Sequence, residues 1–333
     1  MTLPLAVTMG EPAGIGGEIA LRAWLDHRDG IPAFYLIDDP DRLASLARRL
    51  DWPVPVRAID APARAATVFV EALPVAPIGK TIRAEPGCPD ARDAPAILGA
   101  IQTAVRDVQD GRAAAVVTNP IHKDSLYRAG FHHPGHTEYL AELAGADRPP
   151  IMMLVCPELR VVPVTIHLAL KQAIETLSPA AIVHAGRIAA AALRRDFGIT
   201  APVMAVAGLN PHAGEAGSLG REEIEIIEPA LAELRSARID ARGPLPPDTM
   251  FLAEARHSYD AALCMYHDQA LIPIKTIDFH GGVNVTLGLP FVRTSPDHGT
   301  ALAIAGRAVA RPDSLVAALR LAAEMAARRS AGS

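Results

Sequence analysis

The sequence predicts an α/β protein in which helices alternate with the strands of largely parallel sheets. Strand-like apolar runs and helix-like segments alternate along the whole chain of 333 residues, which is the pattern of this fold class. Hydrophobic residues make up 50% of the chain and charged residues 21%, the composition of a globular protein with a large core. At this length we expect two domains.

The first elements follow from local signals. LPLAVT predicts a strand, GEPAGIGGE a turn, and a helix follows from about Ile19. AAAVVT predicts a further strand that ends at Thr118. The turn has glycines at positions 10, 14, 16 and 17. None of them stands at the spacing that the dinucleotide-binding fingerprint requires for its third glycine. We interpret it as a tight strand-to-helix turn, although its backbone amides could still approach a ligand.

The second half of the chain has clearer helix boundaries. Ser178 is predicted to cap a helix that has Pro179 at its first position. Pro229 interrupts a helical run, so we expect a short helix and then a longer one. An amphipathic helix is predicted from Pro312 to about Arg329, with its apolar face docked on the domain.

No flexible linker marks a domain boundary. The turn-rich segments HHPGHTEY and TSPDHGT are the best candidates for crossings between domains. We therefore predict a discontinuous first domain of residues 1–131 plus 299–333, and a second domain of residues 132–298.

Composition excludes several classes of protein. The net charge of −5 gives no electrostatic basis for binding nucleic acid. The cysteines are odd in number and unclustered, which argues against a disulfide framework or a cysteine metal site. No run approaches the length of a membrane span, and the N-terminus lacks the basic start and apolar stretch of a signal peptide. We expect a cytoplasmic enzyme with neither nucleic acid nor membrane as a partner.

Three histidines follow apolar runs that are predicted to be buried strands. VVPVTI precedes His167, VMAVAGLNP precedes His212 and AALCMY precedes His267. In open α/β sheets the ligand crevice lies beyond the carboxyl ends of the strands. Three imidazoles at such an edge could hold one divalent ion, such as zinc, cobalt or nickel. Each histidine taken singly is more often a hydrogen-bonded loop residue, and the spacings match no compact metal motif.

Other polar residues could contact a substrate. In PGHTEY, His136 and Thr137 offer a titratable group and a hydroxyl, although Thr137 could equally start a helix. Lys275 and Arg293 are flanked by apolar residues, so each needs an anionic partner from the protein or from a ligand. Structural salt bridges or surface charges would satisfy them equally well.

Two aspartates could support such a site. Asp268 directly follows His267, and Asp248 lies in the turn PLPPDTM. Either could orient a ligating imidazole, accept a proton or make a turn hydrogen bond. The sequence leaves these roles open.

Seven blocks of sequence resemble a known family. In chain order they are VTMGEPAGIGGE, VVTNPIHK, GHTEYL, VVPVTIHLAL, GLNPHAGEAG, MYHDQALIPIKT and GVNVTLGLPFVRTSPDHGT. They span essentially the whole chain and resemble the 4-hydroxythreonine-4-phosphate dehydrogenase family of pyridoxal phosphate biosynthesis. Several blocks are long and keep the family's order, so chance is a poor explanation.

The resemblance implies a fold and a set of site residues. The fold would be two α/β/α lobes with the active site in a cleft between them, similar to isocitrate and isopropylmalate dehydrogenases. His167, His212 and His267 would hold one divalent metal, zinc, cobalt or magnesium, in a site shared across a homodimer. Substrate would bind at the positions matching His136, Thr137, Lys275, Asn284 and Arg293.

The segment DHGTALAIAG resembles the loop with which those dehydrogenases hold the adenosine end of a dinucleotide. It would bind NAD or NADP through His298, Gly299, Thr300 and Ala305. Ala303 stands where an aspartate is usual, IAGRAVARP lacks a second glycine often seen there, and Gly17 stands where proline is common. The choice between the two cofactors is therefore left open.

The implied reaction is the NAD-dependent oxidation and decarboxylation of 4-phosphooxy-L-threonine to 3-amino-2-oxopropyl phosphate and carbon dioxide. His136 would contact the phosphate or assist proton transfer, and Asp248 or Asp268 would support the metal ligands. One alternative is a related decarboxylating dehydrogenase of an aromatic cis-dihydrodiol carboxylate. Another is a zinc phosphohydrolase, which the lack of carboxylate-rich clusters weakens.

Overall fold

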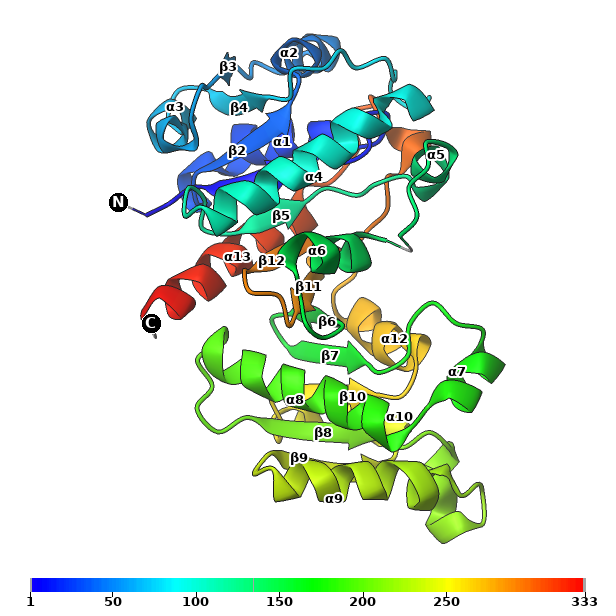
Figure 1. Cartoon of the computed structure of the whole chain (residues 1–333). Helices are drawn as coiled ribbons and strands as arrows, with labels where there is room; N and C mark the ends of the chain where they lie inside the picture. Colours follow the sequence, from blue (N-terminus) through cyan, green and yellow to red (C-terminus); the bar gives the residue numbers. More distant parts are fainter. Residues whose placement is uncertain (1, 134, 332–333) are drawn as a thin grey trace. The chain divides into compact units, whose positions relative to one another are not determined.

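The computed structural model describes residues 2–133 and 135–331 and confirms a mixed α/β fold (Figure 1). The chain divides into two compact units. Unit 1 comprises Met1–Pro149 with Leu289–Ala327, and unit 2 comprises Pro150–Gly288 with Arg328–Ser333. These bounds differ from the predicted domains, because the strand Arg293–Pro296 pairs with Val116–Thr118 of unit 1.

Unit 1 contains six strands whose pairs are parallel, in the order β3-β4-β2-β1-β5-β12. They are β1 (Leu5–Thr8), β2 (Phe34–Asp38), β3 (Val56–Ala58), β4 (Leu73–Pro77), β5 (Val116–Thr118) and β12 (Arg293–Pro296). Every residue of β1, β2, β5 and β12 is buried, as expected for parallel strands covered by helices on both faces.

The helices of unit 1 supply the apolar faces that cover these strands. They are α1 (Gly16–His27), α2 (Pro40–Arg49), α3 (Ala65–Phe69), α4 (Ala94–Gln109), α5 (Lys123–Arg128), α6 (His136–Ala144) and α13 (Asp313–Ala331). In α4, Ile97, Ala100, Ile101 and Ala104 repeat at helical spacing and join one core cluster with residues of β1 and β2. Figure 1 shows α4 lying across these strands.

Unit 2 has strand order β11-β6-β7-β10-β8-β9. The strands are β6 (Ile151–Cys156), β7 (Leu159–Pro163), β8 (Val203–Ala207), β9 (Asp240–Leu245), β10 (Ala261–Cys264) and β11 (Val283–Leu287). Strands β7, β10, β8 and β9 pair in parallel. Strand β6 is antiparallel to both neighbours, β11 and β7. A two-residue connection leads directly from β6 to β7 and reverses the chain, which makes that pair antiparallel.

The helices of unit 2 include the two whose starts were predicted, one after Ser178 and one near Pro229. They are α7 (Leu170–Thr176), α8 (Pro179–Arg195), α9 (Glu228–Ser236), α10 (Pro247–Met250), α11 (Ala253–Arg256) and α12 (His267–Ile277). Ser178 Oγ accepts a hydrogen bond from the amide of Ala181 at 3.3 Å, so the predicted cap of α8 is confirmed. A π-helical turn, Glu223–Ile227, precedes α9 and its Pro229.

Within the described ranges, no single helix is both long and apolar enough to cross a membrane. Helices α7 and α8 are bent relative to each other by 91°. Only when taken together do they have the length and apolar composition of a membrane span.

Candidate functional site

The strands that precede the three histidines are neighbours in unit 2. Strand β10 lies between β7 and β8 and pairs in parallel with both, with Cys264 opposite Pro163 and Leu263 opposite Val206. The carboxyl ends of these strands therefore meet at one edge of the sheet. His167, His212 and His267 each follow one of these ends within a few residues.

Two of the histidines lie close together. The ring centroids of His167 and His267 are 5.7 Å apart, and both side chains line a pocket of about 250 Å³. Its other lining residues are Thr165, Leu168, Leu170, Ala173, Tyr266 and Asp268. The pocket opens at the carboxyl ends of β7 and β10, where a ligand of the sheet would bind.

Asp268 orients the ring of His267. Its Oδ1 lies 2.7 Å from Nδ1 of His267. An ionised carboxylate only accepts hydrogen bonds, so Nδ1 donates and the lone pair of a neutral ring is on Nε2. This leaves Nε2 as the nitrogen that could bind a metal.

His212 is held on a separate loop, the helical turn Pro211–Gly217. Among the described residues, no group of three histidine, cysteine or acidic side chains is arranged to hold a metal ion. The described lining of the pocket thus includes His167 and His267 but not His212. Two imidazoles, one of them oriented by a carboxylate, still fit the donor chemistry of a borderline divalent ion.

Both His167 and His212 adopt left-handed backbone conformations, with φ of 51° and 52°. Such values are uncommon for residues other than glycine and cost free energy. Unfavourable backbone conformations that the surrounding structure maintains are common at functional sites. These backbone conformations were not predicted from the sequence.

Unit 1 contains a second group of predicted residues. Arg293 on β12 is 3% exposed, and its Nη2 donates to Oγ1 of Thr118 at 2.6 Å. Burial lowers the pKa of Arg293 to about 10, so the guanidinium keeps its charge at neutral pH. A buried cation of this kind is stabilised by an anion.

His136 begins α6 near this arginine. Burial first, and then the positive charges of Arg293 and Lys123, hold the pKa of His136 well below its ordinary value. Its Nε2 is buried and has no hydrogen-bond partner in the part of the chain that the structure describes. The half-buried Thr137 follows in the same helical turn. A neutral imidazole and two cations would suit an anionic ligand.

Three further predicted residues lie in unit 2 and are not in the described lining of the histidine pocket. Lys275 lies in the last turn of α12, with its ammonium 5.5 Å from the ring centroid of Phe279. Asn284 is half-buried on β11, and Asp248 is exposed in α10.

The predicted dinucleotide segment packs on the glycine-rich turn in unit 1. The carbonyl of Thr300 accepts a hydrogen bond from the amide of Ile15 at 3.0 Å, and a Cβ on Gly14 would lie 2.8 Å from that oxygen. Gly14 is therefore required by close backbone approach. Ala305 is buried, and Nδ1 of His298 lies 3.0 Å from the carbonyl of Gly299.

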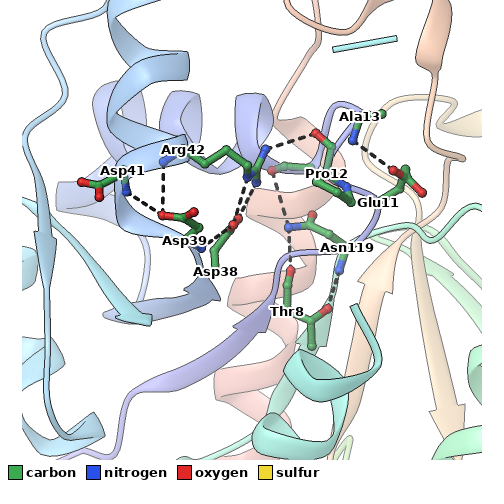
Figure 2. A network of polar contacts seen from close by, with 10 residues as sticks. Thr8, Glu11, Pro12, Ala13, Asp38, Asp39, Asp41, Arg42 and Asn119 are labelled. Carbon is green, nitrogen blue, oxygen red and sulfur yellow. Dashed lines mark hydrogen bonds and ion pairs between the residues drawn. The ribbon is translucent and has the colours of Figure 1, made fainter. Parts of the chain in front are cut away.

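The glycine-rich turn is itself tied into the protein. Ala13 donates to the carboxylate of Glu11 at 3.1 Å, and Glu11 donates to the carbonyl of Pro120 at 2.8 Å. The turn is buried throughout, which agrees with its interpretation as a strand-to-helix turn. Figure 2 shows the surrounding network, in which Arg42 joins Asp38 to the carbonyl of Pro12.

Two cations, Lys123 and Arg42, were not among the residues predicted from the sequence. Lys123 begins α5 and His136 begins α6, so no periodicity within a single element links them. Arg42 follows Asp38 by four residues, but Asp38 ends a strand and Arg42 lies in a helix. No spacing rule covers a pair that spans two kinds of element.

Comparisons with known proteins agree with this arrangement. A sequence model of the family described as "Pyridoxal phosphate biosynthetic protein PdxA" matches residues 31–322. A 4-hydroxythreonine-4-phosphate dehydrogenase from Bradyrhizobium diazoefficiens is 58% identical over 338 residues, covering 98% of each chain.

Solved structures extend the comparison. A 4-hydroxythreonine-4-phosphate dehydrogenase from Klebsiella pneumoniae superposes with a TM-score of 0.87 at 37% identity, covering 98% of this chain and 100% of that one. A terephthalate 1,2-cis-dihydrodiol dehydrogenase from Burkholderia xenovorans has a TM-score of 0.65 at 27% identity, with 97% and 98% of the two chains covered. With the family match and this near-complete coverage, the chain belongs to the PdxA family of pyridoxal phosphate biosynthetic proteins.

Proposed function

We propose that the protein is a 4-hydroxythreonine-4-phosphate dehydrogenase. It would oxidise and decarboxylate 4-phosphooxy-L-threonine to 3-amino-2-oxopropyl phosphate and carbon dioxide, with NAD or NADP as the hydride acceptor. The observation that carries this choice is the 58% identity, over 98% of both chains, to a relative of that name. The cations of unit 1 and the paired imidazoles of unit 2 support it.

The substrate phosphate would bind at Arg293, His136 and Thr137. Arg293 is buried beside Thr118, and its guanidinium could form charge-assisted hydrogen bonds to a phosphate. His136, kept neutral by its surroundings, can donate one hydrogen bond without adding charge. Lys275 and Asn284 would contact the remaining polar groups of the substrate.

His167, His212 and His267 would hold one divalent metal. When bound, the ion would act as a Lewis acid that acidifies the substrate hydroxyl and stabilises charge during decarboxylation. Imidazole ligands favour zinc or cobalt over magnesium. Asp268 would fix the ring of His267 through the 2.7 Å contact with Nδ1. Because one described chain does not gather all three histidines, we propose that a homodimer shares the site.

The proposed reaction requires the protein to accept one proton and to allow another to be delivered. Hydride leaves the hydroxyl-bearing carbon, the hydroxyl loses its proton, and the neighbouring carbon takes up a proton after carbon dioxide departs. The low pKa of His136 suits a neutral hydrogen-bond partner better than a strong base. Asp268 and Asp248 remain the candidates for proton acceptor.

The segment with His298, Gly299, Thr300 and Ala305 would hold the dinucleotide. Its packing on the glycine-rich turn gives it a rigid base in unit 1. A cytoplasmic location remains a prediction from the sequence.

The decisive experiment follows NADH and carbon dioxide together. The protein is reconstituted with metal and incubated with 4-phosphooxy-L-threonine and NAD, with and without a chelator. Equal amounts of NADH and carbon dioxide, lost on chelation and restored by zinc or cobalt, are expected. Phosphate release without NADH would instead indicate a phosphohydrolase.

A decarboxylating dehydrogenase of a cis-dihydrodiol carboxylate is the second candidate function. It is favoured by the TM-score of 0.65 between this chain and a terephthalate 1,2-cis-dihydrodiol dehydrogenase. Such a substrate carries no phosphate and would not require the buried cation at Arg293. Inorganic phosphate should therefore compete with substrate in the proposed enzyme. Turnover of a cis-dihydrodiol carboxylate that is insensitive to phosphate would favour the second candidate.

A further inference from the structure

The turn that carries His212 is left-handed over five consecutive residues. The φ angles from His212 to Ala216 are 52°, 52°, 78°, 42° and 53°, and only the middle residue, Gly214, is a glycine. L-residues disfavour this conformation, so the surrounding structure must hold it in place. The turn also folds back on the strand end, since a Cβ on Gly208 would lie 2.9 Å from Cα of Ala213.

The carboxylate of Glu223 lies at the centre of this arrangement and is 2% exposed. Its Oε1 accepts hydrogen bonds from the amides of Leu209 and Asn210 at 2.8 and 2.7 Å. Its Oε2 accepts one from Nδ2 of Asn210 at 2.9 Å. These bonds tie the segment before the turn to the π-helical turn Glu223–Ile227.

The same carboxylate contacts the turn itself. A Cβ on Gly214 would lie 2.6 Å from Oε2 of Glu223, so the carboxylate packs directly against the middle of the left-handed run. Asn210 also donates Nδ2 to Glu222 at 2.7 Å. Both hydrogens of the Asn210 amide group are thus used by two neighbouring carboxylates.

We propose that Glu223 is a positioning residue for His212. It holds the left-handed turn in the one conformation that presents the imidazole, and so sets the affinity of the metal site. This inference rests on the proposed function, because it takes His212 as a metal ligand. Glu223 itself contacts neither metal nor substrate.

Glu223→Gln is the sharpest variant because it keeps the shape of the side chain. Its Oε1 can still accept from the two backbone amides. Its NH₂ group, however, would face Nδ2 of Asn210, which is also a donor. Rotating the Asn210 amide would place an oxygen against Glu222, so neither arrangement satisfies every group.

The test measures metal affinity directly, by competition between the purified full-length protein and a chromophoric chelator for Zn²⁺ and Co²⁺. We expect Glu223→Gln to weaken affinity about 10- to 100-fold, the usual effect of removing a group that orients a ligand. The Co²⁺ absorption spectrum should shift as the ligand geometry loosens. Glu225→Gln is the matched control, because Glu225 lies two residues after Glu223, is exposed and pairs with Arg221 four residues before it. It should bind metal as the wild type does.

The outcomes separate this inference from the proposed function. If the wild type binds no metal, or His212→Ala binds it unchanged, the metal assignment itself fails. If His212→Ala loses affinity while a folded Glu223→Gln keeps it, only the role of Glu223 is overturned. If Glu223→Gln does not fold, Glu222→Ala is the deciding variant: it removes the carboxylate that accepts from Nδ2 of Asn210, and a loss of about two- to fivefold in metal affinity is expected. Wild-type affinity in that variant would overturn the inference.

Discussion

Oδ1 of Asp268 lies 2.7 Å from Nδ1 of His267, at the first turn of α12. The two residues are adjacent in sequence, so the carboxylate can fix the ring without help from another element. It sets the tautomer and leaves Nε2 directed away from the contact. The imidazole is therefore oriented before any ligand arrives.

Asp268→Ala should weaken zinc binding about 10-fold or more, because His267 loses the acceptor that orients its ring. Asp268→Asn should lose less, since its amide oxygen can still accept from Nδ1. Chelator competition measures both affinities. Asp240→Asn, at an exposed pair with Arg242, is the control and should match the wild type. Equal affinity in wild type and Asp268→Ala would show that the contact does not support the metal site.

Arg293→Met should raise KM for the phosphorylated substrate about 100-fold, equivalent to about 2.7 kcal/mol, because a charge-assisted phosphate contact is lost. The methionine fills similar space without a buried charge, so the melting temperature should not fall sharply. Steady-state kinetics and a thermal scan report the two effects separately. An unchanged KM would remove Arg293 from the phosphate site.

The depressed pKa of His136 makes a prediction about stability and pH. In the unfolded chain this histidine binds a proton near pH 6.5, whereas in the folded protein it does so only at lower pH. The unfolded state therefore binds more protons below about pH 6.5, and stability falls as pH drops through that window, by at most about 1.4 kcal/mol per pH unit.

His136→Gln should reduce this dependence. Urea unfolding at pH 7.5 and 5.5, with chelator present, gives the change in the free energy of unfolding for each protein. The wild type should lose more stability than the variant between the two pH values. Identical losses would mean that His136 is not responsible.

The fold could be predicted wherever a local signal decides it. The Ser178 cap with Pro179, the strand ending at Thr118 and the C-terminal helix all depend on neighbouring residues, and all are observed. Helix α1 begins at Gly16, earlier than the predicted start near Ile19, because Gly16 and Gly17 of the turn already belong to the helix. The antiparallel pairing of β6 with β11 was not predicted, because the two strands are far apart in sequence and such pairs depend on long-range contacts.

The site could be predicted only in part for the same reason. The three histidines were predicted because each follows the end of an apolar strand. The roles of the basic residues were predicted from the family resemblance. Tertiary packing brings Lys123 close to His136. It also brings Glu223 within hydrogen-bonding distance of the segment before the His212 turn. A left-handed run with four non-glycine residues has no sequence signature, because its stability comes from residues elsewhere in the chain.

The buried pair of Arg42 and Asp38 gives the last prediction. Asp38 is fully buried, and its two carboxylate oxygens accept from Nε and Nη2 of Arg42 at 3.0 and 2.5 Å. Nη1 of Arg42 donates to the carbonyl of Pro12 at 3.1 Å (Figure 2). Because burial of a charge is costly when its partner is removed, Arg42→Ala should destabilise the protein by about 3–5 kcal/mol.

The matched control is Arg48→Ala in the same helix, where the arginine is exposed and bonds only Ser45 among the described contacts. Its cost should stay within about 0.5 kcal/mol. Chemical denaturation measures both variants. Arg42 also links the strand end to the glycine-rich turn, so Arg42→Ala should loosen that turn, and faster amide exchange at Ala13 and Gly14 would report it. Comparable stability of the two alanine variants would mean that the buried pair does not hold the turn in place.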